Sequence, residues 1–310
     1  MAAKQRNDLL DRLLYAALRA LSGTLHCFPI AWSLQMARGV GSLMYVVDRK
    51  HRNRALHNLR HSFPDLPESQ LSTMARQSVG HLGMLGVEVL FTTRLIRLNT
   101  WRNHVQLENF QPVLDLLVRQ KTGMLMLTGH YGNWEVLGYV LATLGFETTS
   151  IARPLDNPYI NRWLLGVREK QGQRIVAKKG ATEDVINVLE EKGAVGLIAD
   201  QNAGSKGVFV DFFGRKASTY KSIGLLAMQY NVPVVVGYAR RTNKPFFFHI
   251  GAQDIIYPAD WANQDDPLRY ITQRYTAAIE KMVRQDPAQY LWVHRRWKSR
   301  PKGELPETYD

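Results

Sequence analysis

The sequence predicts an α/β fold in which helices pack on a mixed sheet to form a sandwich. Short apolar runs of strand length alternate with longer segments whose apolar residues recur at helical spacing. This alternation is typical of α/β proteins. No Ser/Gly/Pro-rich linker or internal repeat interrupts the 310 residues, a length that can bury one large core.

The expected elements follow from apolar periodicity and from the glycines and prolines that bound each run. Strands are expected at residues 123–128, 146–151, 174–177, 194–199, 208–212, 233–238 and 246–250. Helices are expected near 67–92, 110–120, 134–144, 158–171, 181–191, 218–230 and 267–285. Because sites in α/β sheets form at strand ends, we expect the residues that follow three of these strands to converge: His130, Arg153 and Asp200.

The first 50 residues are predicted to be a membrane-associating helical segment, ahead of an α/β domain at 51–302 and a tail at 303–310. Between residues 10 and 21, leucine and alanine recur at helical spacing, with Arg12 and Arg19 among them. Plain core packing is the alternative explanation for this stripe. Arg19 also interrupts any signal-peptide core, so we expect the catalytic domain to stay in the cytoplasm.

The next stretch, Ala20 to Ala37, contains no charged residue but is interrupted by Pro29 and several polar residues, which makes it a poor transmembrane helix. We therefore expect amphipathic helices over residues 7–47 that lie in the membrane interface, with a single N-terminal span as the alternative. A cationic cluster follows and is placed to meet anionic head groups: Arg49, Lys50, Arg52 and Arg54.

The net charge of +13 and pI near 9.8 require a partner, which could be nucleic acid, an anionic membrane or an acidic protein. Nucleic acid is the weakest of these because no zinc-finger spacing, RRM signature or heptad-bearing basic helix is present. The single cysteine, Cys27, excludes an internal disulfide framework and a cysteine-based metal cluster.

The segment 129–135 places His130 and Glu135 where a strand becomes a helix, with Asn133 as the expected N-cap. The two can meet only if the chain bends between them, and Gly132 provides that bend. A carboxylate against one ring nitrogen would fix the imidazole tautomer and make the other nitrogen a better base. A satisfied surface histidine at a turn is the alternative.

This His-x4-Glu spacing is similar to the His-x4-Asp/Glu signature of glycerolipid-type acyltransferases. The rest of the chain resembles the bacterial lipid A biosynthesis acyltransferase family, the lauroyl and myristoyl transferases. Four further blocks carry the likeness in the family's order: 54–59 followed by Phe63-Pro64, 153–158, 200–204 leading to 212–214, and 289–298.

The resemblance implies the α/β sandwich of glycerolipid acyltransferases and a membrane-associated enzyme at the cytoplasmic face of the bacterial inner membrane. It would move a fatty acyl group from an acyl carrier protein or CoA thioester to a hydroxyl of a glycolipid, a lipid A precursor in the best-known members. We expect neither a metal nor a resident cofactor. No G-x-S-x-G elbow, P-loop or H-E-x-x-H motif is present, so we expect direct transfer, with His130 as general base and Glu135 orienting it.

Other residues are expected to support this site. Arg153 is predicted to bind a substrate phosphate or the developing oxyanion, although it could merely solvate a turn. Asp200 could cap the next element or hydrogen-bond His130. The basic run beside Trp292 and Trp297 is predicted to contact the membrane interface or the acidic carrier. The remaining candidates for substrate binding are Asn133, Gln201, Gly214, Arg295, Arg296 and Lys298.

The acceptor and the acyl chain length stay open at this point. After Asp200 the chain continues Gln201-Asn202-Ala203, where lipid A enzymes often carry a histidine or other residues. The alternatives are a lysophospholipid acyltransferase, an acyltransferase for another glycolipid, and a catalytically idle membrane-binding relative.

Overall fold

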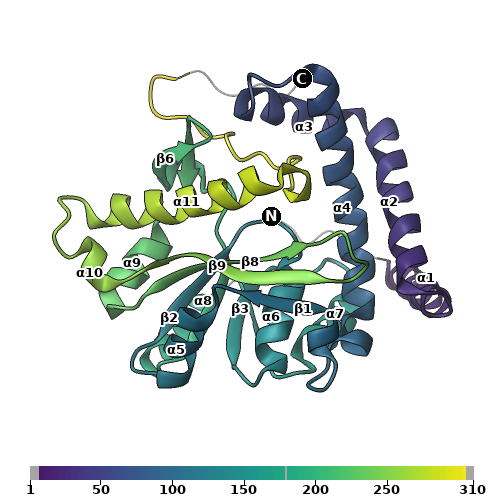
Figure 1. Cartoon of the computed structure of the whole chain (residues 1–310), viewed down its shortest axis with the longest axis horizontal. Coiled ribbons are helices and arrows are strands. Elements are labelled where there is room, and N and C mark those ends of the chain that lie inside the picture. Colours follow the sequence, from purple (N-terminus) through teal and green to yellow (C-terminus); the bar gives the residue numbers. More distant parts are fainter. Residues whose placement is uncertain (1–6, 179, 305–310) are drawn as a thin grey trace.

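The computed structural model, which describes residues 7–178 and 180–304, is built on a seven-stranded mixed sheet with helices on both faces (Figure 1). The strand order is β1-β9-β8-β2-β5-β3-β4, and neighbouring strands are parallel except for the antiparallel pair β8 and β9. The predicted α/β sandwich with a mixed sheet is therefore confirmed. The strands are β1 (Val105–Glu108), β2 (Met124–Thr128), β3 (Thr148–Ala152), β4 (Arg174–Ala177), β5 (Ala194–Ile198), β8 (Val234–Arg241) and β9 (Phe248–Ile256).

Most helices agree closely with those expected from the sequence, but none was expected at Arg49–Ser62 or Pro258–Trp261. They are α1 (Asp8–His26), α2 (Ile30–Val47), α3 (Arg49–Ser62), α4 (Glu68–Leu95), α5 (Gln111–Arg119), α6 (Trp134–Thr143), α7 (Pro158–Glu169), α8 (Ala181–Glu190), α9 (Lys221–Tyr230), α10 (Pro258–Trp261) and α11 (Pro267–Gln285). Short 3₁₀ turns occur at Trp101–Asn103, Gly204–Lys206 and Pro287–Gln289.

The sheet separates two hydrophobic cores, because successive side chains of a strand point to opposite faces. Leu125 and Leu127 of β2 pack on the face that α11 covers. Met124 of the same strand and Val235 of β8 pack on the opposite face, with α5 and α6. Both faces of the central strands are thus buried, which explains why these strands are continuous apolar runs rather than alternating ones.

Further differences from the expected elements also concern mainly short or polar segments. The sequence analysis did not predict β1, a four-residue edge strand. It counted 208–212 among the strands of the mixed sheet, whereas β6 (Val208–Phe212) pairs with β7 (Arg215–Thr219) in a separate two-stranded antiparallel sheet. It began a helix at residue 218, but β7 continues to Thr219 and α9 starts at Lys221.

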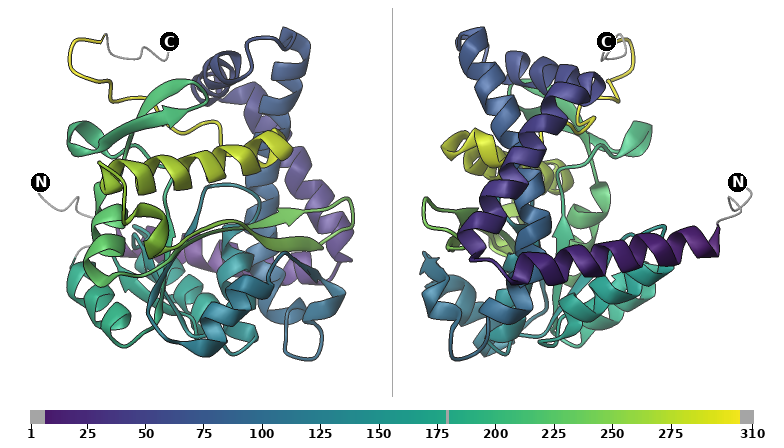
Figure 2. Two further views of the ribbon diagram at one scale, coloured as in Figure 1. Left: turned by 60° about the vertical axis from the view of Figure 1, so that its left-hand side comes forward. Right: turned by 90° about the vertical axis from the view of Figure 1, so that its right-hand side faces the viewer.

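The helix α2 lies along α4, on the side of the molecule away from α10 (Figure 1). Glycines allow this close approach: a Cβ at Gly41 would lie 2.7 Å from the Gly80 Cα, and one at Gly83 would lie 2.6 Å from the Ala37 carbonyl oxygen. The helix α1 extends away at an angle and contacts α7, where Asn157 donates a hydrogen bond to the Asp11 carbonyl (Figure 2).

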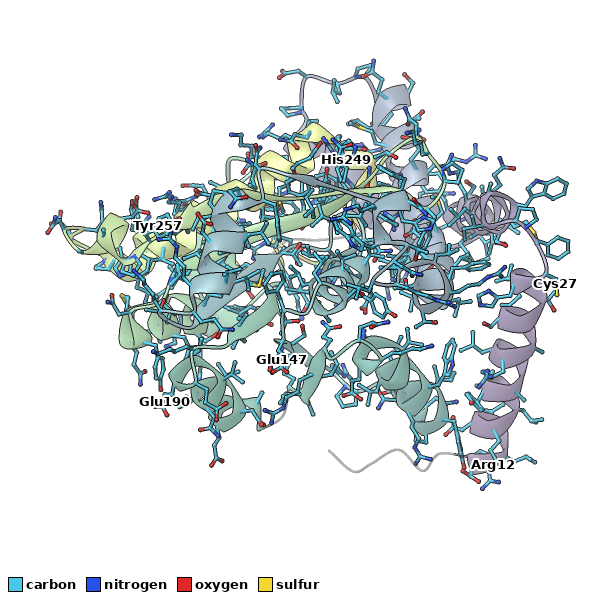
Figure 3. All side chains as sticks on the ribbon, turned by 60° about the horizontal axis from the view of Figure 1, so that its bottom comes forward. Arg12, Cys27, Glu147, Glu190, His249 and Tyr257 are labelled. Carbon is cyan, nitrogen blue, oxygen red and sulfur yellow. The ribbon has the colours of Figure 1, made fainter. Side chains whose placement is uncertain are left out.

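The outward sides of α1 and α2 are apolar and form what we call the apolar N-terminal face. Core packing does not explain most of the leucine stripe of α1, because Leu10, Leu13, Leu14 and Leu21 are exposed; Leu25, near the end of the helix, is buried. Cys27, also exposed, marks the corner between the two helices (Figure 3). The exposed large apolar residues of this face are Leu9, Leu10, Leu13, Leu14, Leu21, Phe28, Trp32, Met36, Val40, Leu43, Met44, Val46 and Val47.

Among the helices of residues 7–178 and 180–304, none is both long and apolar enough to cross a bilayer, so the alternative of a single N-terminal span has no support. The predicted boundary at residue 50 falls in the first turn of α3, which begins at Arg49, and most of the predicted tail, 305–310, lies outside the described residues.

Candidate active site

His130 and Asp200 meet because they follow neighbouring parallel strands. Thr128 at the end of β2 pairs with Ile198 at the end of β5, so the chains that leave the two strands run side by side. One carboxylate oxygen of Asp200 accepts a hydrogen bond from the His130 backbone N–H at 2.8 Å, and the other lies 2.7 Å from the ring Nδ1. This single carboxylate therefore fixes both the backbone and the ring of the histidine.

The electrostatics at Asp200 favour its charged form. Burial by itself would raise the pKa of Asp200, whose side chain is 3% exposed, but His130, through its charge and hydrogen bonds, and the nearby His294 together hold that pKa well below its usual range. A carboxylate can only accept, so the proton lies on Nδ1 of His130 and the lone pair lies on Nε2. Of the two roles expected for Asp200, the hydrogen bond to His130 is confirmed.

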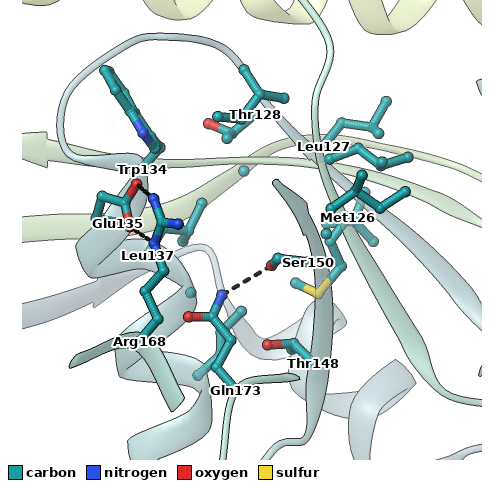
Figure 4. A pocket seen from close by; sticks show the side chains of 18 of the residues that line it. Met126, Leu127, Thr128, Trp134, Glu135, Leu137, Thr148, Ser150, Arg168 and Gln173 are labelled. Carbon is teal, nitrogen blue, oxygen red and sulfur yellow. Dashed lines mark hydrogen bonds and ion pairs between the residues drawn. The ribbon is translucent and has the colours of Figure 1, made fainter. Parts of the chain in front are cut away.

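The expectation that Glu135 orients His130 is wrong. Both carboxylate oxygens of Glu135 accept hydrogen bonds from the guanidinium of Arg168 on α7, at 2.6 and 2.7 Å (Figure 4). The reason is the start of α6 at Trp134, which places Glu135 in the first helical turn and directs its side chain toward α7 instead of back across the bend. Glu135 thus joins two helices beside the site.

Asn133 has a structural role and does not face a substrate. It is the predicted N-cap, with its Oδ1 accepting from the Val136 N–H at 3.0 Å, and its Nδ2 donates to Glu88 at 2.7 Å. Its side chain is fully buried, so the expected contact with substrate is wrong. The neighbouring Gly132 has φ +61°, and a Cβ there would lie 2.1 Å from the Ala239 carbonyl oxygen, which makes this bend specific to glycine.

A buried ion pair between Glu88 and Arg241 holds the bend at Gly132 in place. The guanidinium of Arg241 contacts the Glu88 carboxylate at 2.7 Å, with side chains 5% and 1% exposed, and also donates to the Gly132 carbonyl at 3.0 Å. The same guanidinium lies 3.4 Å from Nδ1 of His81. Burial, with the charges of Arg241 and Arg38, lowers the pKa of His81 to about 3, so this imidazole is neutral. Sequence reasoning missed both Glu88 and Arg241.

The segment 289–298 forms another wall of the site. The Leu291 N–H donates to the His130 carbonyl at 3.0 Å, and the His294 ring centroid lies 4.4 Å from that of His130. Asn58 of α3 holds this segment by donating to the Trp292 and His294 carbonyls. Burial lowers the pKa of His294 to about 4. This segment carries part of the family resemblance, but His294 was not among the predicted site residues.

The predicted basic docking run is only partly at the surface. Arg296 is 1% exposed and donates to the Ser218 carbonyl and the Thr219 hydroxyl, both at 2.6 Å, so its predicted contact with a carrier or membrane is wrong. The indoles of Trp292 and Trp297 are likewise buried. Arg295 and Lys298 are exposed, and their role stays a prediction.

The other predicted binding residues, Arg153, Gln201 and Gly214, lie on three separate segments. Arg153 follows β3 as expected, but its side chain is 83% exposed and its contact with Asp156 is long, at 3.8 Å. The Gln201 carbonyl accepts from Arg296 at 3.3 Å. Gly214, with φ +70°, lies in the turn between β6 and β7. Their substrate contacts stay predictions.

A cavity of about 110 Å³ lies between the sheet and helices α6 and α7, and Trp134, a neighbour of His130, is part of its lining (Figure 4). At one end is Trp134, whose ring centroid lies 4.9 Å from that of His130. Its lining is mainly apolar and includes Met126, Leu137, Leu141, Ile175, Leu197 and Ile198. Within the described residues, no group of histidine, cysteine or carboxylate side chains could hold a metal ion.

A histidine fixed by a buried carboxylate, beside an apolar cavity, is suited to proton transfer on an apolar substrate. The comparisons with known proteins identify the class. The chain belongs to the bacterial lipid A biosynthesis acyltransferase family, whose model matches residues 4–299, and it is therefore an O-acyltransferase, as predicted.

Curated relatives match across most of the chain. It is 25% identical to a lipid A biosynthesis acyltransferase of Haemophilus influenzae, over 94% of this chain and 92% of the relative. It is 26% identical to the lipid A biosynthesis lauroyltransferase of Escherichia coli, over 91% and 89% of the two chains. A phosphatidylinositol mannoside acyltransferase of Mycobacterium tuberculosis is 22% identical over 59% of this chain and 57% of its own.

Proposed function

We propose that this enzyme transfers a fatty acyl group from an acyl carrier protein or CoA thioester to a hydroxyl of a lipid A precursor. The family supports the acceptor class, since most of the relatives above are named for lipid A biosynthesis. The observation that carries the mechanism is the 2.7 Å contact between His130 Nδ1 and Asp200 beside an apolar cavity.

In this mechanism Nε2 of His130 is the general base. It removes the proton from the acceptor hydroxyl as the hydroxyl oxygen attacks the thioester carbonyl carbon. The tetrahedral intermediate then collapses, the C–S bond breaks, and the leaving thiolate takes the proton back from the imidazolium. Asp200 keeps the ring in the required tautomer and stabilises the imidazolium. No acyl-enzyme forms.

The developing oxyanion needs hydrogen-bond donors near His130. The first N–H groups of α6, at Trp134 and Glu135, have no partner within the helix, and the positive end of the helix dipole lies there. These amides are the nearer candidate for the oxyanion. Arg153, exposed and only weakly paired, is proposed to bind an anionic group of the substrate instead.

The apolar N-terminal face is proposed to bind the membrane that holds the acceptor. An exposed apolar surface of this extent is typical of membrane or protein interaction sites. Cations at the start of α3 follow it directly, and Arg49 and Lys50 are exposed. Each cation near an anionic surface contributes about 1 kcal/mol. The enzyme would then lie peripherally on the cytoplasmic face of the inner membrane.

An acyl carrier protein is the proposed donor partner, and Arg295 and Lys298 are the exposed cations nearest in sequence to His294. Reversing both charges to Glu should raise the KM for acyl-carrier protein but leave that for acyl-CoA unchanged, because CoA does not present an acidic protein surface. Lys281→Glu on α11 is the matched control. An equal change for both donors would argue against this docking surface.

The activity itself is tested by transfer of labelled acyl groups to a panel of a lipid A precursor, a mannosylated phosphatidylinositol and a lysophospholipid. We expect label in the lipid A precursor and loss of at least about a hundredfold in His130→Ala. Preference for the lysophospholipid would replace the proposed acceptor. Transfer to none of them, from either donor, would leave only a membrane-binding role.

A further inference from the structure

The cavity between the sheet and helices α6 and α7 has a polar end, opposite the end at Trp134. At that end, Nε2 of Gln173 donates a hydrogen bond to the Ser150 hydroxyl at 2.9 Å (Figure 4). Gln173 is 8% exposed, and the adjacent Thr148, also buried, has a hydroxyl with no hydrogen-bond partner among the described residues. All three side chains line the cavity.

The strands explain this arrangement. Thr148, Ser150 and Ala152 alternate along β3 and therefore point to one face of the sheet, the face that Met126 and Thr128 of β2 share. Their order along β3 runs from the polar end of the cavity toward the end near His130. The four residue steps from Thr148 to Ala152 correspond to about 13 Å.

Two glycines show that the polar pair is closely fitted. A Cβ at Gly138 on α6 would lie 2.4 Å from Gln173 Nε2, and a Cβ at Gly196 on β5 would lie 2.8 Å from the Ser150 hydroxyl. The glutamine and serine thus occupy space that side chains on the neighbouring elements would otherwise fill. They are held between α6 and the sheet and have little room to move aside.

We propose that Gln173 and Ser150 form the floor of the acyl pocket and limit the length of the transferred chain. This inference rests on the proposed function. A chain that just fills the apolar part buries every methylene. The end of a longer chain would meet the Gln173 amide and the Ser150 hydroxyl instead of apolar side chains. Its last methylenes would then gain no apolar burial, and the hydrogen bond between Gln173 and Ser150 would have to break. Discrimination of about tenfold or more per additional methylene pair is expected.

The test compares acyl-CoA donors of increasing even chain length with wild type, Gln173→Ala and Ser150→Ile. Gln173→Ala opens the floor, so its preferred chain should be longer than that of wild type by at least one methylene pair. Ser150→Ile fills the pocket with a residue that suits a strand, so its preferred chain should be shorter. Gln229→Ala, an exposed glutamine on α9, is the control and should keep the wild-type preference.

The outcomes separate the inference from the function on which it rests. If wild type transfers no chain to any acceptor, from acyl-CoA or from acyl carrier protein, the proposed function fails. If wild type is active and both folded variants keep its chain-length optimum, Gln173 and Ser150 do not limit the length of the chain. Selective transfer of chains that carry a hydroxyl group near the far end would also contradict a length limit, because it would make the three polar groups a recognition site.

Discussion

At the scale of single residues, the site depends on which carboxylate reaches His130. Glu135, the nearer one in sequence, pairs with Arg168 on α7. Asp200, which lies 70 residues after His130 at the end of the neighbouring strand, contacts the His130 ring instead. Sequence reasoning could place Asp200 at the right edge of the sheet but left its partner open. The partner of Glu135 could not be predicted, because nothing local distinguishes Arg168 from other cations.

The buried pair of Glu88 and Arg241 should be necessary for the stability of the loop that carries His130. Arg241→Met leaves Glu88 charged, buried and without its cation, a change that typically costs about 3–5 kcal/mol. Urea unfolding would measure this loss. Arg174→Met, which breaks an exposed pair with Asp184, is the control and should change stability by less than about 1 kcal/mol. Similar losses in both variants would count against the support we assign to the pair.

Two partly buried histidines, His81 and His294, predict how stability depends on pH. The folded-state pKa values of His81 and His294 are lowered to about 3 and about 4, mainly by burial, from an unfolded value near ~6.5. Between these limits the unfolded chain binds more protons than the folded one. Stability is therefore fully present above pH ~6.5 and falls as the pH drops toward 4, by up to about 1.4 kcal/mol per pH unit for each histidine.

The measurement is urea unfolding between pH 7.5 and 4.5, for wild type and His81→Gln. The variant lacks one of the two titrations, so the slope of its unfolding free energy against pH should be smaller. Asp200 adds little slope in this range, because its folded pKa and its unfolded value of ~3.9 both lie below pH 4.5. Identical slopes for the two proteins would show that His81 is not held neutral.

At the scale of elements, the helices of the N-terminal segment bury one side and expose an apolar other side. The sequence stripe indicated amphipathic helices, but it could not tell whether the apolar side faces the core or solvent. The glycines of α2 and α4 determine which side faces the core. The two helices contact each other through these small residues, so Trp32, Met36 and Val40 of α2 point to solvent.

Substitutions on this face should weaken binding to vesicles without loss of fold. Trp32→Glu and Val40→Glu each remove an exposed apolar side chain from the proposed interface and add charge. Burial of such a side chain contributes about 1.5–3 kcal/mol, so we expect at least about a tenfold loss of affinity for anionic vesicles in a flotation assay. Leu225→Glu on α9 is the matched control. Equal loss in the control, or none in either variant, would contradict this membrane face.

At the scale of the whole molecule, the apolar runs predicted the mixed sheet and most element boundaries within a few residues, because both faces of the central strands are buried. The short edge strand β1 and the polar strand β7 were not predicted, because neither carries a long apolar run. The burial of a charged residue, Arg296, was not predicted either. Arg296 looks like part of a solvated run in sequence, yet three backbone and side-chain acceptors enclose its guanidinium.

The central claim is that Asp200, and not Glu135, orients His130 for acyl transfer. Its most direct test is the rate of acyl transfer to a lipid A precursor by Asp200→Asn and Glu135→Gln, each compared with wild type and His130→Ala after a check of folding. We predict that Asp200→Asn loses about 10³-fold or more in kcat, close to His130→Ala, because the wrong tautomer is favoured. Glu135→Gln, which can keep a hydrogen bond to Arg168, should stay within about tenfold of wild type. An active Asp200→Asn beside an inactive Glu135→Gln would contradict the claim.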